Sequence, residues 1–128
     1  MFNTIKTTSD IEHFLDKTNC LHDGYIIGVC YANNGISKTN CGHFFDPEKT
    51  KLSIKILVTS IYDTIIEIVF ENILEWQIRD NQFDITDTSV TFDEQKMIVW
   101  ADDVCVNMNE LKKGSYVIAK SMKWRIVE

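Results

Sequence analysis

Cysteine and histidine stand two residues apart at two places in the sequence, Cys20 with His22 and Cys41 with His43. Thiolate and imidazole groups bind Zn²⁺, and residues two apart on an extended strand share a face. Each pair could therefore give two ligands to one ion, in a Cys₂His₂ metal site. The spacing between the pairs matches no zinc pattern with a stated mechanism, and a chain with a full core does not need a structural zinc. We therefore predict no cofactor and keep the metal site as an alternative.

The same residues could act in nucleophilic catalysis, with His22 as base, Asp23 orienting it, and Cys20, Cys30 or Cys41 as nucleophile. Neighbours on a strand point to opposite faces, so His22 and Asp23 should not pair there. Cys20 also follows the C-terminal end of a predicted helix, where the helix dipole disfavours a thiolate. We name no catalytic residue and favour the absence of enzyme activity.

The stretch Leu21-His22-Asp23-Gly24 has a third interpretation, as a structural motif where a helix passes into a strand. The side chain of His22 or Asp23 can bond free backbone groups at such a junction. Gly24, which lacks a Cβ, avoids crowding. This is the interpretation that we favour: the motif holds the fold.

An amphipathic helix should precede the motif. The stretch Ser9–Glu12 fits a capping box, whose first and last side chains bond each other's backbone amides. Apolar residues follow at helical spacing, namely Ile11, Phe14 and Leu15. We expect a helix at about residues 10–18 with Ser9 as its cap, packed on a sheet.

After the motif, apolar residues alternate with a period of two, which is typical of β-strands. The expected strands cover residues 24–31, 51–58, 64–70, 73–78, 90–92, 97–101 and 116–126. The alternation shifts at Glu71-Asn72, and Asn107 could cap one short helical turn. No long helix separates the strands, so their pairing should be mostly antiparallel. The sequence predicts one α+β domain over residues 1–128, with the N-terminal helix packed on a strongly bent meander sheet or open barrel of six to seven strands. Trp76, Trp100 and Trp124 are expected in its core.

The net charge of −6 is concentrated in one segment. Residues 63–110 carry twelve acidic and two basic side chains, whereas residues 111–128 carry one acidic and five basic. This balance disfavours nucleic acid as a partner, because phosphates need Lys and Arg, and suits a basic protein partner. The predicted partner-binding residues are Glu67, Glu71, Glu75, Asp80, Asp84 and Asp87. A solvated acidic face is the alternative.

Motifs for nucleotide binding, calcium loops and metalloprotease chemistry do not occur in the sequence. The N-terminus lacks the layout of a signal peptide, and no apolar run approaches the roughly 20 residues that span a bilayer. We therefore expect a cytoplasmic protein with no membrane partner, whose cysteines are thiols.

Four features together resemble a loose group of small bacterial proteins, some of which look like immunity proteins of polymorphic or contact-dependent toxin systems. They are the apolar-His-Asp stretch after a capped helix, IVFENILEWQI (68–78), MIVWADD (97–103) and YVIAKSMKWRIVE (116–128). The resemblance spans most of residues 10–126 and brings no catalytic residues with it. It implies a protein-binding role, as an inhibitor of a basic toxin.

Three functions follow as hypotheses. The first is a non-enzymatic protein-binding domain, of the immunity type. The second is a small-ligand or metal-binding module around Cys20, His22, Cys41 and His43, with or without enzyme activity. The third is a purely structural or oligomer-forming domain, and the oligomeric state stays open at this point.

Overall fold

The computed structural model describes residues 1–33, 36–40, 42–79, 84–104 and 107–127, and only the backbone of residues 36–39, 43 and 44. In chain order the elements are β1 (Asn3–Ile5), α1 (Thr8–Lys17), η1 (Asn19–Leu21), β2 (Gly24–Asn33), β3 (Ile36–Thr39), β4 (Gly42–Phe45), η2 (Pro47–Lys49), β5 (Thr50–Val58), η3 (Thr59–Ile61), β6 (Thr64–Gln77), β7 (Asp84–Ile85), β8 (Ser89–Phe92), β9 (Ile98–Ala101), α2 (Met108–Leu111) and β10 (Tyr116–Val127). The η elements are single turns of 3-10 helix.

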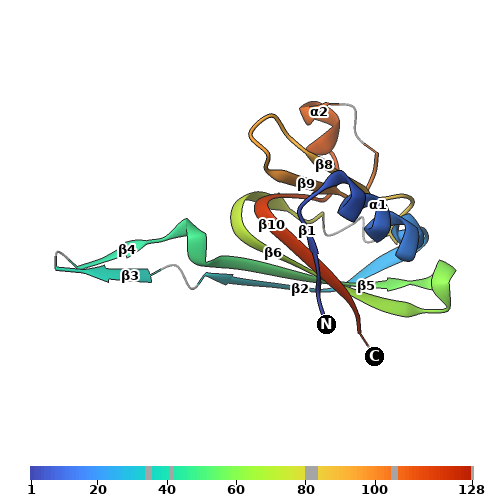
Figure 1. The fold of residues 1–128 in the computed structure, drawn as a ribbon, viewed down its shortest axis with the longest axis horizontal. Helices are drawn as coiled ribbons and strands as arrows, with labels where there is room; N and C mark the ends of the chain where they lie inside the picture. The colour runs from blue at the N-terminus through green and yellow to red at the C-terminus, as the bar shows by residue number, and fades with distance from the viewer. Residues whose placement is uncertain (34–35, 41, 80–83, 105–106, 128) are drawn as a thin grey trace.

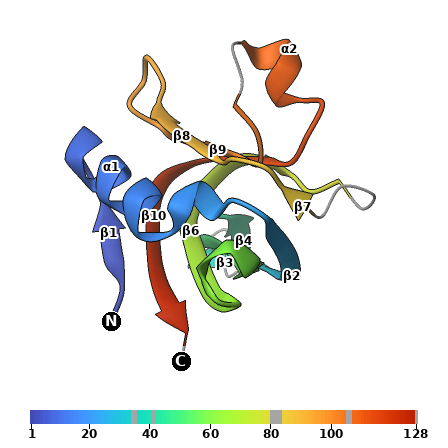
Figure 2. The same cartoon turned by 90° about the vertical axis from the view of Figure 1, so that its right-hand side faces the viewer.

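Eight of the strands form one antiparallel sheet in the order β7-β2-β5-β6-β10-β9-β8, with β1 paired to β10. The sheet curls into a half-barrel, and α1 packs against it (Figures 1 and 2). The predicted α+β class, the N-terminal helix and the bent antiparallel sheet are confirmed. The sheet has more strands than expected because β1 and β7, of three and two residues, are too short to show an alternating pattern.

The helix begins two residues earlier than predicted, and its cap is Thr7 rather than Ser9. The Thr7 hydroxyl accepts a hydrogen bond from the amide of Asp10 at 3.2 Å. The Asp10 carboxylate in turn accepts from the amides of Lys6 and Thr7, each at 2.9 Å. The sequence thus contains two overlapping Ser/Thr-x-x-acid patterns, and the chain uses the first. These amide bonds, with that to Lys6 the largest cause, lower the pKa of Asp10.

The β2–β5 ribbon continues into a second, two-stranded sheet. Strands β3 and β4 pair from Ile36 with Phe45 to Thr39 with Gly42. This hairpin projects from the half-barrel as an arm (left in Figure 1). Residues 36–50, which fall outside the strands expected from the sequence, therefore contain regular pairing, because short strands without a clear apolar alternation carry little sequence signal.

Both long central strands change face near their middle. Phe70 and Ile73 of β6 are both buried although they lie three residues apart, and Asn72 between them has φ of 58°. On the paired strand β10, Ala119 and Met122 are likewise both buried. The change of face predicted at Glu71-Asn72 is therefore present, while the register with β10 shifts between Ile118 and Ala119, which pair with Glu75 and Ile73.

The main core joins α1 to the inner face of the sheet, and a smaller cluster lies beneath α2. The second cluster consists of Ala101, Leu111, Tyr116 and Ile118. Trp100 and Trp124 are buried as expected, with Trp124 against the Phe14 ring at 5.4 Å between centroids. Trp76 differs, because it is 36% exposed and stacks on Tyr31 at 5.4 Å. The apolar alternation predicted the correct face of the sheet for Trp76, but this end of the sheet is open, so the side chain is only partly covered.

Candidate functional site

The backbone of the Leu21-His22-Asp23-Gly24 motif is not extended. Asn19, Cys20, Leu21 and Asp23 all have φ between 52° and 57°, in the left-handed region. Non-glycine residues pay of order 1–3 kcal/mol each for such conformations, so surrounding contacts must impose them. One such contact is the Leu21 side chain, which is fully buried in the main core.

His22 connects this turn to the segment that follows β7. Its Nδ1 lies 2.6 Å from the carbonyl oxygen of Thr86 and 3.3 Å from a carboxylate oxygen of Asp87. Its Nε2 lies 3.6 Å from the carboxylate of Asp23. The Thr86 carbonyl and then the Asp23 charge raise the pKa of His22, and Asp87 adds to the effect.

The expectation that His22 and Asp23 point apart is therefore wrong. It assumed that both residues lie on the strand, but β2 begins only at Gly24, and the left-handed φ of Asp23 turns its side chain toward the imidazole. Asp23 also contributes its backbone carbonyl, which accepts from the hydroxyl of Thr59 at 2.8 Å.

Hydrogen bonds hold residues 84–89 on two sides. On one side lie the His22 contact and a hydrogen bond from the amide of Thr88 to the carbonyl of Cys20 at 2.9 Å. On the other side the Thr88 hydroxyl donates to the carbonyl of Ala101 at 2.5 Å, and Ser89 donates to the carbonyl of Asp103 at 2.9 Å. The motif thus positions a segment that is 60 residues away in the sequence.

Gly24 fills a place where a side chain does not fit. A Cβ atom there would lie 2.7 Å from the carbonyl oxygen of Leu21 and 3.0 Å from a methyl carbon of Ile56. The first neighbour is backbone and cannot rotate away. The crowding that we expected at Gly24 is therefore present, while the structural role of the whole motif stays a prediction for the variants below.

Cys20 and His22 lie before β2, and the backbone of His43 lies beyond the other end of that strand. His22 precedes its first residue, whereas β4, which contains the backbone of His43, lies in the arm beyond its last (Figure 1). A ten-residue strand spans about 30 Å. Cys41 and the His43 side chain are outside the described residues. Among the side chains that are described, no three His, Cys, Asp or Glu form a group that could hold a metal ion.

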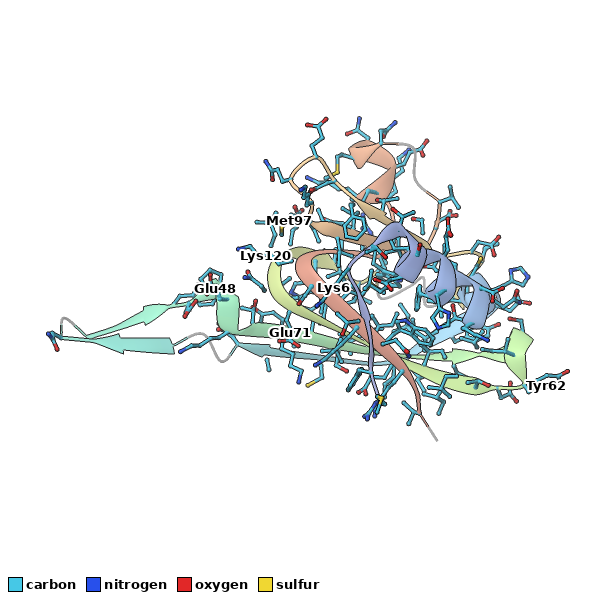
Figure 3. The ribbon with its side chains drawn as sticks, in the orientation of Figure 1. Lys6, Glu48, Tyr62, Glu71, Met97 and Lys120 are labelled. Carbon is cyan, nitrogen blue, oxygen red and sulfur yellow. The ribbon has the colours of Figure 1, made fainter. Side chains whose placement is uncertain are left out.

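The three glutamates predicted to bind a partner have partners in the same sheet, two of them basic residues and the third a tyrosine. The contacts are Glu67 with Arg125 at 2.7 Å, Glu71 with Lys123 at 3.2 Å, and Glu75 with the hydroxyl of Tyr116 at 2.5 Å. Glu71 can be located in Figure 3. Strand β10 carries the basic C-terminal segment alongside β6, so the charges of the two segments offset each other. Burial, followed by the Glu75 bond, raises the pKa of Tyr116 to about 12 and keeps it a hydroxyl donor.

Of the remaining predicted acidic residues, Asp87 contacts His22, Asp80 is outside the described residues, and Asp84 lines a hollow of about 530 Å³. The hollow lies between β7, the chain after β9, and α2. Its lining residues are Asp84, Thr86, Asp102, Asp103, Val104, Glu110, Lys113 and Gly114. Four of these eight are acidic and one is basic. The charge balance of residues 63–110 predicted an acidic face, but it could not show which of the residues meet in this hollow.

Asp102 is the buried carboxyl of this hollow, with 8% of its surface exposed. Burial, and to a smaller extent the charges of Asp103 and Asp84, raise its pKa. Gly114 makes room for it, because a Cβ at that position would lie 2.5 Å from a carboxyl oxygen of Asp102. The Asn107 side chain caps α2 through the amide of Glu110 at 3.0 Å, as the sequence predicted, and so positions the Glu110 side of the hollow.

No family model, curated protein or solved structure matches the chain. Among the described residues, no helix has both the length and the apolar character needed to cross a membrane.

Proposed function

We propose that this chain is a non-enzymatic protein-binding domain that recognises a basic partner through the acidic hollow, in the manner of an immunity-type inhibitor. The observation that carries this proposal is the convergence of Asp84, Asp102, Asp103 and Glu110 on one hollow of about 530 Å³.

Charge supports a basic ligand for this hollow. Lys113 is the one cation in its described lining, and the whole chain has a net charge of −6. Complementary charge accelerates association and selects among partners. A lysine or arginine side chain of a partner would also lower the electrostatic cost of ionising the buried Asp102.

The contact surface proposed here differs from the one predicted from the sequence. Glu67, Glu71 and Glu75 already have intramolecular partners, so a protein ligand would have to compete with them. Asp84 is exposed and lies on the hollow. The binding face is therefore centred on β7 and α2 rather than on β6.

The test uses the most basic of the proteins encoded by the flanking genes, with binding measured by isothermal titration calorimetry at low and high salt. The expected result is a complex that weakens with salt and loses about 10-fold in affinity in the double variant Asp84→Asn, Glu110→Gln. Asp16→Asn, an exposed carboxylate on α1, is the matched control and should bind normally. An equal loss in the control, or binding that ignores the hollow variants, would contradict the proposal.

A further inference from the structure

The neighbour of β10 changes from β9 to β1 at Lys120 and Ser121, and we call this place in the sheet the wedge. Along one edge, β10 pairs with β9 at Tyr116–Ala119 and with β1 at Met122–Trp124. Lys120 and Ser121 fall between the two and pair with neither. Because β10 also changes face here, these residues lie at a corner of the sheet, with β1 and β9 diverging from it (Figure 2).

The wedge contains a second hollow, of about 710 Å³, which shares no lining residue with the acidic one. Its lining includes Ile5, Lys6, Phe92, Lys96, Ile98 and Lys120. Ile5 and Ile98 are almost fully buried, and Phe92 is half-buried. The apolar part of the wedge is thus continuous with the main core.

Three lysines surround this apolar surface: Lys6, Lys96 and Lys120, of which the first and last are labelled in Figure 3. All three are exposed. Within the described part of the chain, none of their ammonium groups forms an ion pair. The described lining of the hollow includes no acidic residue, although acidic residues outnumber basic ones in the chain by 19 to 13.

Two carboxylates near these lysines along the chain, those of Asp10 and Asp93, accept hydrogen bonds from backbone amides, whereas Glu94 is exposed in the same turn as Lys96. Asp10 accepts from the amides of Lys6 and Thr7 at 2.9 Å and completes the cap of α1. Asp93 accepts from the amides of Gln95 and Met97 at 2.8 and 2.9 Å, in the turn that carries Lys96. These four bonds hold the two carboxylates in their own turns, and the described lining of the wedge contains the three lysines and no acidic side chain.

We propose that the wedge binds a small amphiphilic anion, a carboxylate, sulfate or phosphate attached to a hydrocarbon chain. The hydrocarbon chain lies on the accessible part of Phe92 and along the aliphatic stems of the lysines, and the ammonium groups hold the acidic group at the rim. Apolar lining with a few convergent polar groups is the usual character of a ligand site, and the hollow is within the usual range of volumes. This function is independent of the acidic hollow and of any protein partner.

The test is titration of the intact chain with decanoate below its micelle concentration, followed by calorimetry and by NMR chemical-shift changes. Hexanoate has the same acidic group and a shorter chain. Decyltrimethylammonium has the same chain and the opposite charge. We expect saturable decanoate binding, weaker hexanoate binding, and no saturable binding of the cation. The shift changes should centre on Phe92, Ile98 and Ser121.

Substitution of the lysines tests the acidic-group contact without touching the core. Lys120→Gln and Lys6→Gln should each weaken decanoate binding about 5-fold, and the triple variant with Lys96→Gln should lose it. The matched control is Lys17→Gln, an exposed lysine at the other end of α1, which should bind as the parent does. Thermal melting of each variant checks that it folds.

Several results would overturn the proposal. They are undiminished decanoate binding by a folded triple variant, equal affinity for decyltrimethylammonium, shift changes confined to other parts of the chain, and the absence of saturable binding by the parent chain.

Discussion

The imidazole Nδ1 of His22 lies 2.6 Å from the carbonyl oxygen of Thr86, a residue that lines the acidic hollow. The turn after α1 and the hollow are therefore parts of one arrangement. The hydrogen bond between Thr88 and Cys20 reinforces the same connection. A change in the motif should alter both the stability of the fold and the position of one side of the hollow.

The His22 contact predicts a pH-dependent stability. Because the Thr86 carbonyl, followed by Asp23, raises the pKa of His22 above its ordinary value, the folded chain binds the ring proton more strongly than the unfolded chain does. The stabilisation is complete below about pH 6 and is lost as the pH rises through the raised pKa. The melting temperature of the parent should therefore exceed that of His22→Gln most near pH 6, and the difference should shrink toward alkaline pH.

The control is His13→Gln, which leaves the contact between His22 and Thr86 in place. A difference between parent and His22→Gln that is constant or grows with pH would show that the ring is not held in its protonated form.

Removal of metal offers a second test of the motif. Since His22 and β4 lie at opposite ends of β2, a chelator should leave the melting temperature of the parent and of His22→Ala unchanged. Near-stoichiometric zinc in the purified protein, lost in His22→Ala, would instead support the Cys₂His₂ alternative.

The helix cap predicts different effects for two similar substitutions. Thr7→Ala removes the acceptor for the Asp10 amide and should cost about 1 kcal/mol of unfolding free energy. Ser9→Ala should cost almost nothing, because Ser9 is an exposed residue inside the helix. Urea denaturation of the two variants measures both free energies. A larger loss of stability for Ser9→Ala would show that Ser9, and not Thr7, is the cap of the helix.

The fold class could be predicted because the alternation of apolar residues is strong in β2, β5, β6 and β10. The arrangement at His22 could not. Cys20 and Leu21 have no preference for the left-handed region, and their conformations depend on the burial of Leu21 and on contacts with residues far along the chain. The predicted start of the strand at residue 24 agrees with β2, but the strand geometry assumed for His22 and Asp23 turned Asp23 the wrong way.

The acidic residues illustrate a second limit. A charge sum along the chain cannot show that β10 places Arg125 beside Glu67 and Lys123 beside Glu71. The alternation of basic residues in the C-terminal strand was the available signal, but it becomes useful only when the strand order is known. Once β6 is set beside β10, the excess acidic charge remains near β7, β9 and α2.

Core packing predicts a large loss for Trp124→Ala. The side chain is 3% exposed and contacts the Phe14 ring of α1. Its truncation should cost about 3–5 kcal/mol, through lost burial and the cavity left behind. Trp76→Ala, in the same sheet but 36% exposed, is the comparison and should cost markedly less. Equal losses in denaturant titrations of the two variants would contradict the difference in burial.

Asp102 makes a prediction of the opposite sign. Burial raises its pKa, so the folded chain prefers the neutral carboxyl, and ionisation near neutral pH works against folding. Asp102→Asn keeps an oxygen acceptor and the approximate shape next to Gly114 while removing the charge. Its melting temperature should therefore exceed that of the parent near pH 7. The gain should fall as the pH drops through the raised pKa of Asp102, and it should vanish below the ordinary pKa of an aspartate, about 3.9, where the carboxyl is neutral in the folded and the unfolded chain alike. Exposed Asp16→Asn, measured over the same pH range, is the control for the loss of one negative charge. Lower stability of Asp102→Asn at neutral pH would show that the fold stabilises the charged carboxylate. A gain in stability that does not depend on pH would contradict the raised pKa of Asp102.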